Sequence, residues 1–76
     1  MISIGKDVPI SVDREVMGGV PVFTGTRVPI SALLDNVEAG VSLDDFLENF
    51  PTVSREQAVG VIGHFRAQLD DVSLAA

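Results

Sequence analysis

Apolar residues recur with helical spacing in three segments of the second half of the chain, over residues 30–39, 43–50 and 55–70. In each segment, one apolar residue is followed by others three, four or seven positions later, which places them on one face of a helix. The pattern therefore predicts three amphipathic helices. Their apolar stripes are Ile30, Leu33, Leu34 and Val37 in the first, Leu43, Phe46, Leu47 and Phe50 in the second, and Ala58, Val61, Ile62, Phe65 and Leu69 in the third.

The residues that flank these segments are typical of helix ends. Gly40 follows the first segment and is a common helix-terminating residue. Ser42 is a good N-cap for the second segment, and Pro51 ends it, because the residue before a proline disfavours helical geometry. Ser54 with Gln57 forms a capping box at the start of the third.

The first 29 residues have weaker patterns that indicate extended structure. Apolar residues alternate at Ile2 and Ile4 and again at Val8, Ile10 and Val12. Pro9 cannot donate a backbone hydrogen bond, which predicts an edge strand or an extended arm for the second run. Asp13 is expected to cap a short turn that ends at Gly18 and Gly19. Residues 20–23 and 27–30 are expected to pair as a small hairpin around residues 24–26.

These elements predict a mainly α fold: a three-helix, helix-turn-helix bundle with a short N-terminal β arm or hairpin. Residues 1–76 are expected to form a single domain, with the arm or hairpin at 1–29, the helical core at 30–70 and a frayed tail at 71–76. A chain of this size buries only about 60–65% of the surface that its unfolded form exposes. We therefore expect a homodimer, because self-association often completes so small a core.

Composition and charge exclude several classes of function. The net charge of −6 repels DNA and anionic membranes at long range, and it suits a basic protein partner. The chain has no cysteine, and its single histidine, His64, cannot hold zinc alone, so no metal or cofactor is expected. The apolar runs are too short to cross a bilayer and the N-terminus does not resemble a signal peptide, which predicts a cytoplasmic protein. No phosphate-binding loop, dinucleotide fingerprint or nucleophile elbow occurs, so no catalytic residue is expected and the chain is not predicted to be an enzyme.

Residues 18–29 combine glycines and prolines with a single charged residue, Arg27. Glycine permits positive φ and proline fixes φ, so the path of this segment is determined by its own backbone. Two interpretations of Arg27 stay open. Its guanidinium either holds an anion or a partner carboxylate beside the turn, or it caps turn carbonyls and pairs with an acidic helix.

The third predicted helix has two polar flanks with a smooth strip between them. Arg55 and Arg66 lie on one flank, about 16 Å apart along the helix. The strip consists of small residues that permit close approach by a second helix, a partner protein or a phosphate backbone: Gly60, Gly63 and Ala67. If this is a recognition helix, its DNA contacts would come from Arg55, Gln57, Gly60, His64 and Arg66. Asp44 and Asp45 argue against DNA, since they would repel phosphates at the preceding helix.

The glycine- and proline-rich residues 18–29 and several neighbouring segments resemble a known family. The segments Asp13-Arg14-Glu15, Gly18 to Val22, Gly25 to Pro29, Ala39 to Ser42 and Phe50-Pro51 resemble the bacterial and archaeal family known as domain of unknown function 433. The motif positions are Gly19, Pro21, Gly25, Thr26, Arg27 and Pro29. The resemblance implies a homeodomain-like trihelical fold with a short β arm, usually dimeric. Many members look like antitoxins of toxin–antitoxin pairs, similar to the VapB type, with genes beside a PIN-like nuclease.

The function expected from these observations is that of a small antitoxin-like regulator. It would cover a basic PIN-like nuclease partner with its acidic helices, and operator DNA is a further candidate partner. The alternative is a homodimeric protein-interaction module that does not bind DNA. Binding to the protein's own upstream DNA distinguishes the two hypotheses.

Overall fold

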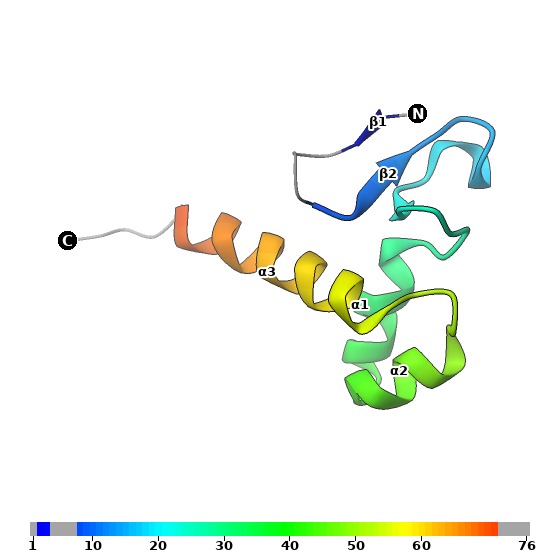
Figure 1. Cartoon of the computed structure of the whole chain (residues 1–76). Coiled ribbons are helices and arrows are strands. Elements are labelled where there is room, and N and C mark those ends of the chain that lie inside the picture. Colours follow the sequence, from blue (N-terminus) through cyan, green and yellow to red (C-terminus); the bar gives the residue numbers. More distant parts are fainter. Residues whose placement is uncertain (1, 4–7, 72–76) are drawn as a thin grey trace.

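The computed structural model describes residues 2–3 and 8–71, and Figure 1 shows the arrangement of their elements. A small sheet at the N-terminal end precedes three helices, which confirms a mainly α fold with an N-terminal β arm. The helix-turn-helix geometry of the homeodomain type stays a prediction. In chain order the elements are β1 (Ile2–Ser3), β2 (Ile10–Val12), a turn of 3-10 helix at Met17–Gly19, β3 (Val22–Phe23), α1 (Ile30–Glu38), α2 (Leu43–Asn49) and α3 (Arg55–Asp71).

The helices begin and end within a residue of their predicted bounds, because local side chains satisfy their end groups. At the end of α1, Gly40 adopts φ +78°. The N–H groups of Gly40 and Val41 then donate to the carbonyls of Val37 and Asn36. This is a Schellman ending, and it requires a residue that tolerates the left-handed region.

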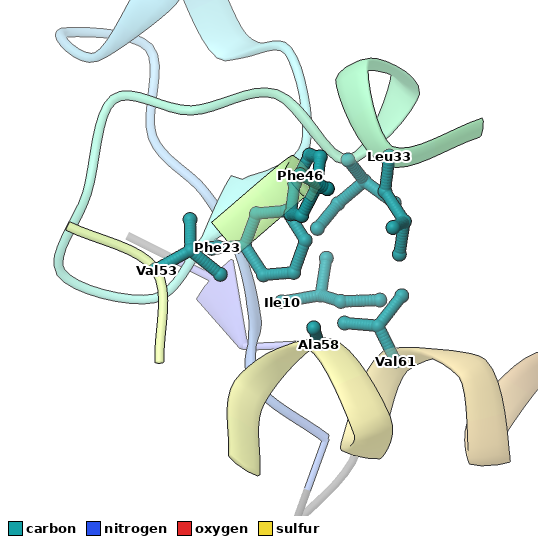
Figure 2. Packing of buried hydrophobic residues seen from close by; sticks show 8 residues of the cluster. Ile10, Phe23, Leu33, Phe46, Val53, Ala58 and Val61 are labelled. Atoms are coloured by element: carbon teal, nitrogen blue, oxygen red, sulfur yellow. The ribbon is translucent and has the colours of Figure 1, made fainter. Parts of the chain in front are cut away.

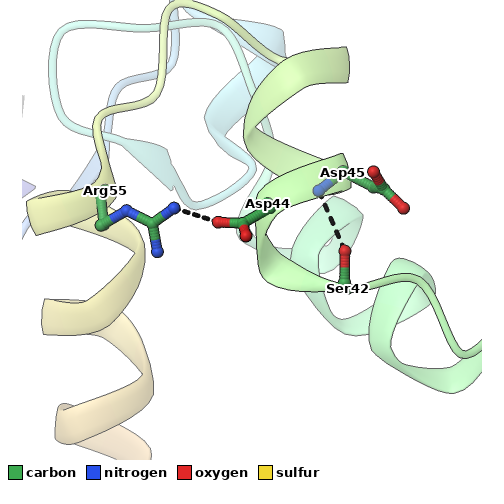
Figure 3. Close-up of polar contacts among 4 residues, drawn as sticks. All are labelled: Ser42, Asp44, Asp45 and Arg55. Carbon is green, nitrogen blue, oxygen red and sulfur yellow. Dashed lines mark hydrogen bonds and ion pairs between the residues drawn. The ribbon is translucent and has the colours of Figure 1, made fainter.

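The starts of α2 and α3 are capped as the sequence predicts. The Ser42 hydroxyl accepts a hydrogen bond from the Asp45 N–H at 3.1 Å (Figure 3). At α3, the Ser54 hydroxyl accepts from the Gln57 N–H, and the Gln57 side-chain oxygen accepts from the Ser54 N–H. The capping box is therefore complete. The helix of α3 includes Asp71, and the rest of the predicted frayed tail, 72–76, lies outside the described residues.

The sheet has three short antiparallel strands in the order β1-β2-β3. The edge-strand prediction for β2 is wrong: β2 is the central strand, pairing Ile2 with Val12 on one side and Ile10 with Phe23 on the other. Pro9 permits this because it precedes the strand and takes part through its carbonyl, which accepts from the Thr24 N–H at 3.0 Å. The predicted position of Ile4 in a strand lies outside the described residues.

The turn segments follow the predicted local chemistry. The Asp13 carboxylate accepts a hydrogen bond from the Glu15 N–H at 2.9 Å, which caps the turn before Met17–Gly19. The hairpin after β3 is short: the Phe23 N–H donates to the Val28 carbonyl at 3.0 Å, and Val22 forms a single bridge with Pro29. The prolines limit this pairing, since they cannot donate to a ladder.

The core lies where the sheet meets the three helices (Figure 2). Phe23 from β3 and Phe46 from α2 are both fully buried, with ring centroids 6.1 Å apart. Ala58 and Val61 bring α3 against them, and Leu33 brings α1. Aromatic packing at the centre thus joins the glycine- and proline-rich segment to the helical unit.

Four of the thirteen residues in the predicted apolar stripes lie outside this core, which corrects the expectation that they are buried. Leu34 and Val37 of α1 are 45% and 59% exposed, and Ile62 and Leu69 of α3 are 44% and 69% exposed. Figure 1 shows the C-terminal half of α3 running out beyond α1 and α2. The helical spacing of these residues is as predicted, but the described part of this chain provides too little surface to cover them.

Candidate functional site

Gln57 is a predicted DNA contact, but both polar atoms of its side chain form hydrogen bonds within the protein. Its Oε1 accepts from the Ser54 N–H at 3.0 Å and its Nε2 donates to the Thr24 carbonyl at 2.8 Å. The amide therefore ties the start of α3 to the turn after β3. A glutamine that reads an adenine needs the same donor and acceptor. In this arrangement, Gln57 is not free to read a base.

The two arginines of α3 differ in their surroundings. Arg55 forms an ion pair with Asp44 at the start of α2 (Figure 3), and both side chains are well exposed. Such a pair contributes about 0–1 kcal/mol to stability, so its main effect here is to neutralise Arg55. Arg66 is exposed and makes no ion pair or side-chain hydrogen bond within residues 2–3 and 8–71.

The structure corrects the placement of Gly60 on an outer strip. A β-carbon built on Gly60 would lie 3.3 Å from the ring of Pro9, so the N-terminal arm already occupies the space that the glycine leaves. Gly63 has open space at the same position, and Ala67 is exposed. The strip available to another molecule is therefore limited to Gly63 and Ala67.

His64, another predicted DNA contact, is partly enclosed by the fold. His64 is half-buried, with its ring centroid 5.9 Å from that of Phe65. Its Nε2 lies 3.2 Å from the Gln68 side-chain nitrogen. Together with Phe65 and Gln68 it lines a hollow of about 290 Å³ against Pro21 and Ile30. Of the five predicted DNA contacts, only Arg66 is exposed without an intramolecular partner among the described residues.

The family-motif positions build a rigid turn. Gly25 adopts φ +78°, and the Thr26 hydroxyl donates to the Phe23 carbonyl and accepts from the Val28 N–H. On the flanks, the Pro21 carbonyl accepts from the Ile30 N–H, and Pro29 bridges to Val22. The remaining motif glycine, Gly19, has φ +91°. These residues fix the backbone, which accounts for the glycines, the threonine and the prolines of the motif.

Arg27 projects from this turn and does not perform the structural role that one interpretation gave it. It is exposed, and it caps no carbonyl and pairs with no carboxylate in the described part of the chain. Arg27 lines a hollow of about 590 Å³ that is open to solvent. The other lining residues are Ser11, Asp13, Val16, Val22, Gly25, Thr26, Val28 and Thr52.

The outer surfaces of α1 and α2 carry five carboxylates and no basic residue. On α1, Asp35 and Glu38 lie beside the exposed Leu34 and Val37, and we call these four residues the α1 face. Sequence reasoning missed it as a surface, because the two apolar residues fit the stripe of a buried helix. Their position beyond Leu33, toward the end of a nine-residue helix, is the one signal that could have placed them outside.

Within residues 2–3 and 8–71, the structure gathers no three His, Asp or Glu side chains that could hold a metal ion. In the same ranges, no helix has both the length and the apolar character that a membrane crossing requires. The features with distinctive chemistry are thus the α1 face and the hollow at Arg27.

The fold defines a small, mainly α domain in which a three-stranded N-terminal sheet packs on three helices. The chain belongs to the family described as protein of unknown function (DUF433), whose model matches residues 10–63. The match includes every motif position from Gly19 to Pro29. The resemblance drawn from the sequence is confirmed at the level of the family.

Two relatives extend this result. The chain is 40% identical over 43 residues to the uncharacterized protein y4eO of Sinorhizobium fredii, and the match covers 57% of this chain and 20% of that protein. It is also similar in fold to the crystal structure of a DUF433 member from Anabaena variabilis, with a TM-score of 0.68 and 22% identity. That likeness covers 86% of this chain and 64% of the other. The chain thus spans about one fifth of the first protein and less than two thirds of the second.

Proposed function

We infer that this protein is an antitoxin-like regulator that binds a basic, PIN-like nuclease partner through the α1 face. The observation that carries the proposal is the composition of that face. Leu34 and Val37 are large, apolar and about half exposed, and they stand among carboxylates without a basic residue on the same helix. An apolar centre with a charged rim is typical of protein-binding surfaces.

The charge of the helical unit supports a basic partner. Of the five carboxylates on α1 and α2, Asp44 is paired with Arg55, and Asp35, Asp45, Glu38 and Glu48 form no ion pair among the described residues. Complementary charge speeds the encounter of two proteins and suppresses wrong partners. The same field repels the phosphates of nucleic acid. The partner proposed here therefore has a basic surface with an apolar depression.

Four of the five α3 residues predicted to contact DNA have neighbours within the protein instead, which weakens the case for operator DNA. Arg55, Gln57, Gly60 and His64 each have an intramolecular neighbour at the position where a DNA contact was expected. Arg66 alone is available on that helix. The interaction module that does not bind DNA is therefore the second candidate function, and the two candidates share the α1 face.

The exposed apolar residues of α3 support self-association on a separate surface. Val59, Ile62 and Leu69 are each more than two-fifths exposed, and Gly63 leaves room for close approach. Homodimerisation through α3 is compatible with a partner on α1. It stays a prediction.

The test of the proposed function is binding to the product of the neighbouring open reading frame, measured by titration calorimetry. Replacing Leu34 and Val37 together by serine removes the apolar centre, and we expect the dissociation constant to rise by about 100-fold. The matched control replaces Val59 and Leu69 by serine on α3, where we expect a change of less than about threefold. Circular dichroism checks that each variant is helical.

Two outcomes separate the candidates. A neighbour product that does not bind, or that binds both double variants equally, contradicts the proposal. Fluorescence anisotropy with the upstream DNA then decides whether the protein is also a DNA-binding regulator. Salt-sensitive, sequence-specific binding supports a regulator, and the absence of binding at low salt supports the interaction module.

A further inference from the structure

The hollow beside the family-motif turn is a cavity that the proposed function does not use. It lies between the turn after β3 and Thr52 in the connection from α2 to α3, with Val22 at its base. Val22 is only 2% exposed, and the Val16 and Val28 side chains are half-buried. Its volume of about 590 Å³ lies within the range of ligand sites in proteins.

Most polar groups that line the hollow already form hydrogen bonds within the protein. The Thr26 hydroxyl both donates and accepts within the turn, and the Ser11 hydroxyl is hydrogen-bonded to that of Thr24 at 2.8 Å. One Asp13 oxygen accepts from the Glu15 N–H. The guanidinium of Arg27 is different, because it has no partner in the described chain. A ligand would therefore find one strong cationic donor above an apolar base.

This combination selects a carboxylate next to an apolar group. A guanidinium matches a carboxylate with two parallel hydrogen bonds. The valines accept the apolar side chain, which gains free energy by leaving water. Asp13 lines the same hollow, so the local charge is balanced and a dianionic phosphate is less favoured than a singly charged carboxylate.

We propose that the Arg27 hollow binds an extended peptide segment of a partner protein in which a Glu or Asp carboxylate pairs with Arg27 and the adjacent branched or aromatic side chain lies on Val16, Val22 and Val28. The hollow is open to solvent, so side chains of an extended segment can enter it from outside. The backbone at Arg27 is fixed before binding by Gly25 and by both hydrogen bonds of Thr26. Preorganisation of this kind lowers the entropic cost of binding.

The site is independent of the α1 face. Arg27 belongs to the hairpin, and none of the residues that line the hollow lies on α1. Loss of peptide binding through Arg27 therefore leaves the predicted nuclease-like partner on α1 untouched, and failure of one proposal does not remove the other.

The experiment titrates the full chain with capped pentapeptides that carry Glu beside Val, Leu or Phe, followed by NMR at the methyl groups of Val16, Val22 and Val28. We expect saturable shifts at these methyls for at least one peptide. Changing Glu to Gln in that peptide, or making the Arg27→Gln variant, is expected to weaken binding about tenfold, and both changes together no further. Arg66→Gln is the matched control and is expected to leave the affinity unchanged.

A second variant tests the hollow without removing the charge. Thr52→Trp fills the opening from an exposed position and is expected to weaken peptide binding as much as Arg27→Gln does. The proposal is overturned if no peptide shifts the valine methyls at millimolar concentration, or if the Gln peptide binds as tightly as the Glu peptide. Tighter binding of inorganic phosphate or of a short single-stranded oligonucleotide at Arg27 overturns it as well.

Discussion

Replacing Phe46 by alanine is expected to lower the free energy of unfolding by about 3–5 kcal/mol. Phe46 is fully buried, and its ring packs on Phe23 at 6.1 Å and on Phe50 at 4.9 Å between centroids. The truncation leaves a cavity where β3, α2 and α3 meet. A domain of this length has a total stability of roughly 4–11 kcal/mol, so the loss removes a large fraction of it. Urea titration followed by circular dichroism measures the loss.

The control for this variant is Phe65→Ala, which removes the same group from a half-buried position on α3. We expect it to cost clearly less than Phe46→Ala, because the cost depends on the cavity that remains. Equal losses for the two variants would contradict the position of the core. A melting temperature of Phe46→Ala within a degree or two of the parent would do so as well.

The second large effect is expected at Gly60, where leucine should displace the N-terminal arm from α3. The β-carbon alone would lie 3.3 Å from the Pro9 ring, so the ring would have to shift, and the further atoms of leucine add to this crowding. Overpacking of this kind costs about 1–3 kcal/mol. Urea titration gives the stability, and NMR shifts of Ile10 to Val12 report whether β2 has moved.

Gly63→Leu is the matched variant, because the same helix has open space at that position. It is expected to keep or slightly raise stability, since leucine is a better helix former than glycine. If α3 mediates self-association, Gly63→Leu lowers the dimer fraction in analytical ultracentrifugation while β2 keeps its shifts. A Gly60→Leu variant as stable as Gly63→Leu would show that the arm does not rest on α3.

The bounds of the helices were predictable because they depend on neighbours in the sequence. Gly40 needs its own φ and two carbonyls of the preceding turn, and Ser42 and Ser54 bond to backbone three residues away. Interactions of this range are visible in the order of residues. The family motif was visible for the same reason, since Gly25 and Thr26 act within one turn.

The uses of the α3 side chains were not predictable, because they depend on segments far along the chain. The Gln57 amide meets the Thr24 carbonyl across 33 residues, and Gly60 meets Pro9. A helical wheel shows which residues share a face, but not where the neighbouring element ends. Leu34 and Leu69 therefore look like core positions in the sequence, and they are exposed in the structure.

The candidate site also has features that the sequence predicts and features that depend on distant segments meeting. The acidic character of α1 and α2 could be read from composition alone. The α1 face could not, since it exists only because Leu34 and Val37 lie beyond the reach of the core. Arg27 could be singled out as the only charge in its segment, but its hollow requires Thr52 and Asp13 to come together.

The most direct test of the α1 face as the partner-binding surface is methyl cross-saturation NMR on the complex with the neighbouring gene product. Saturating the partner is expected to reduce the methyl signals of Leu34 and Val37 and to leave those of Ile62 and Leu69 on α3 at full intensity. Signal loss confined to the α3 methyls, with Leu34 and Val37 unchanged, would contradict the account.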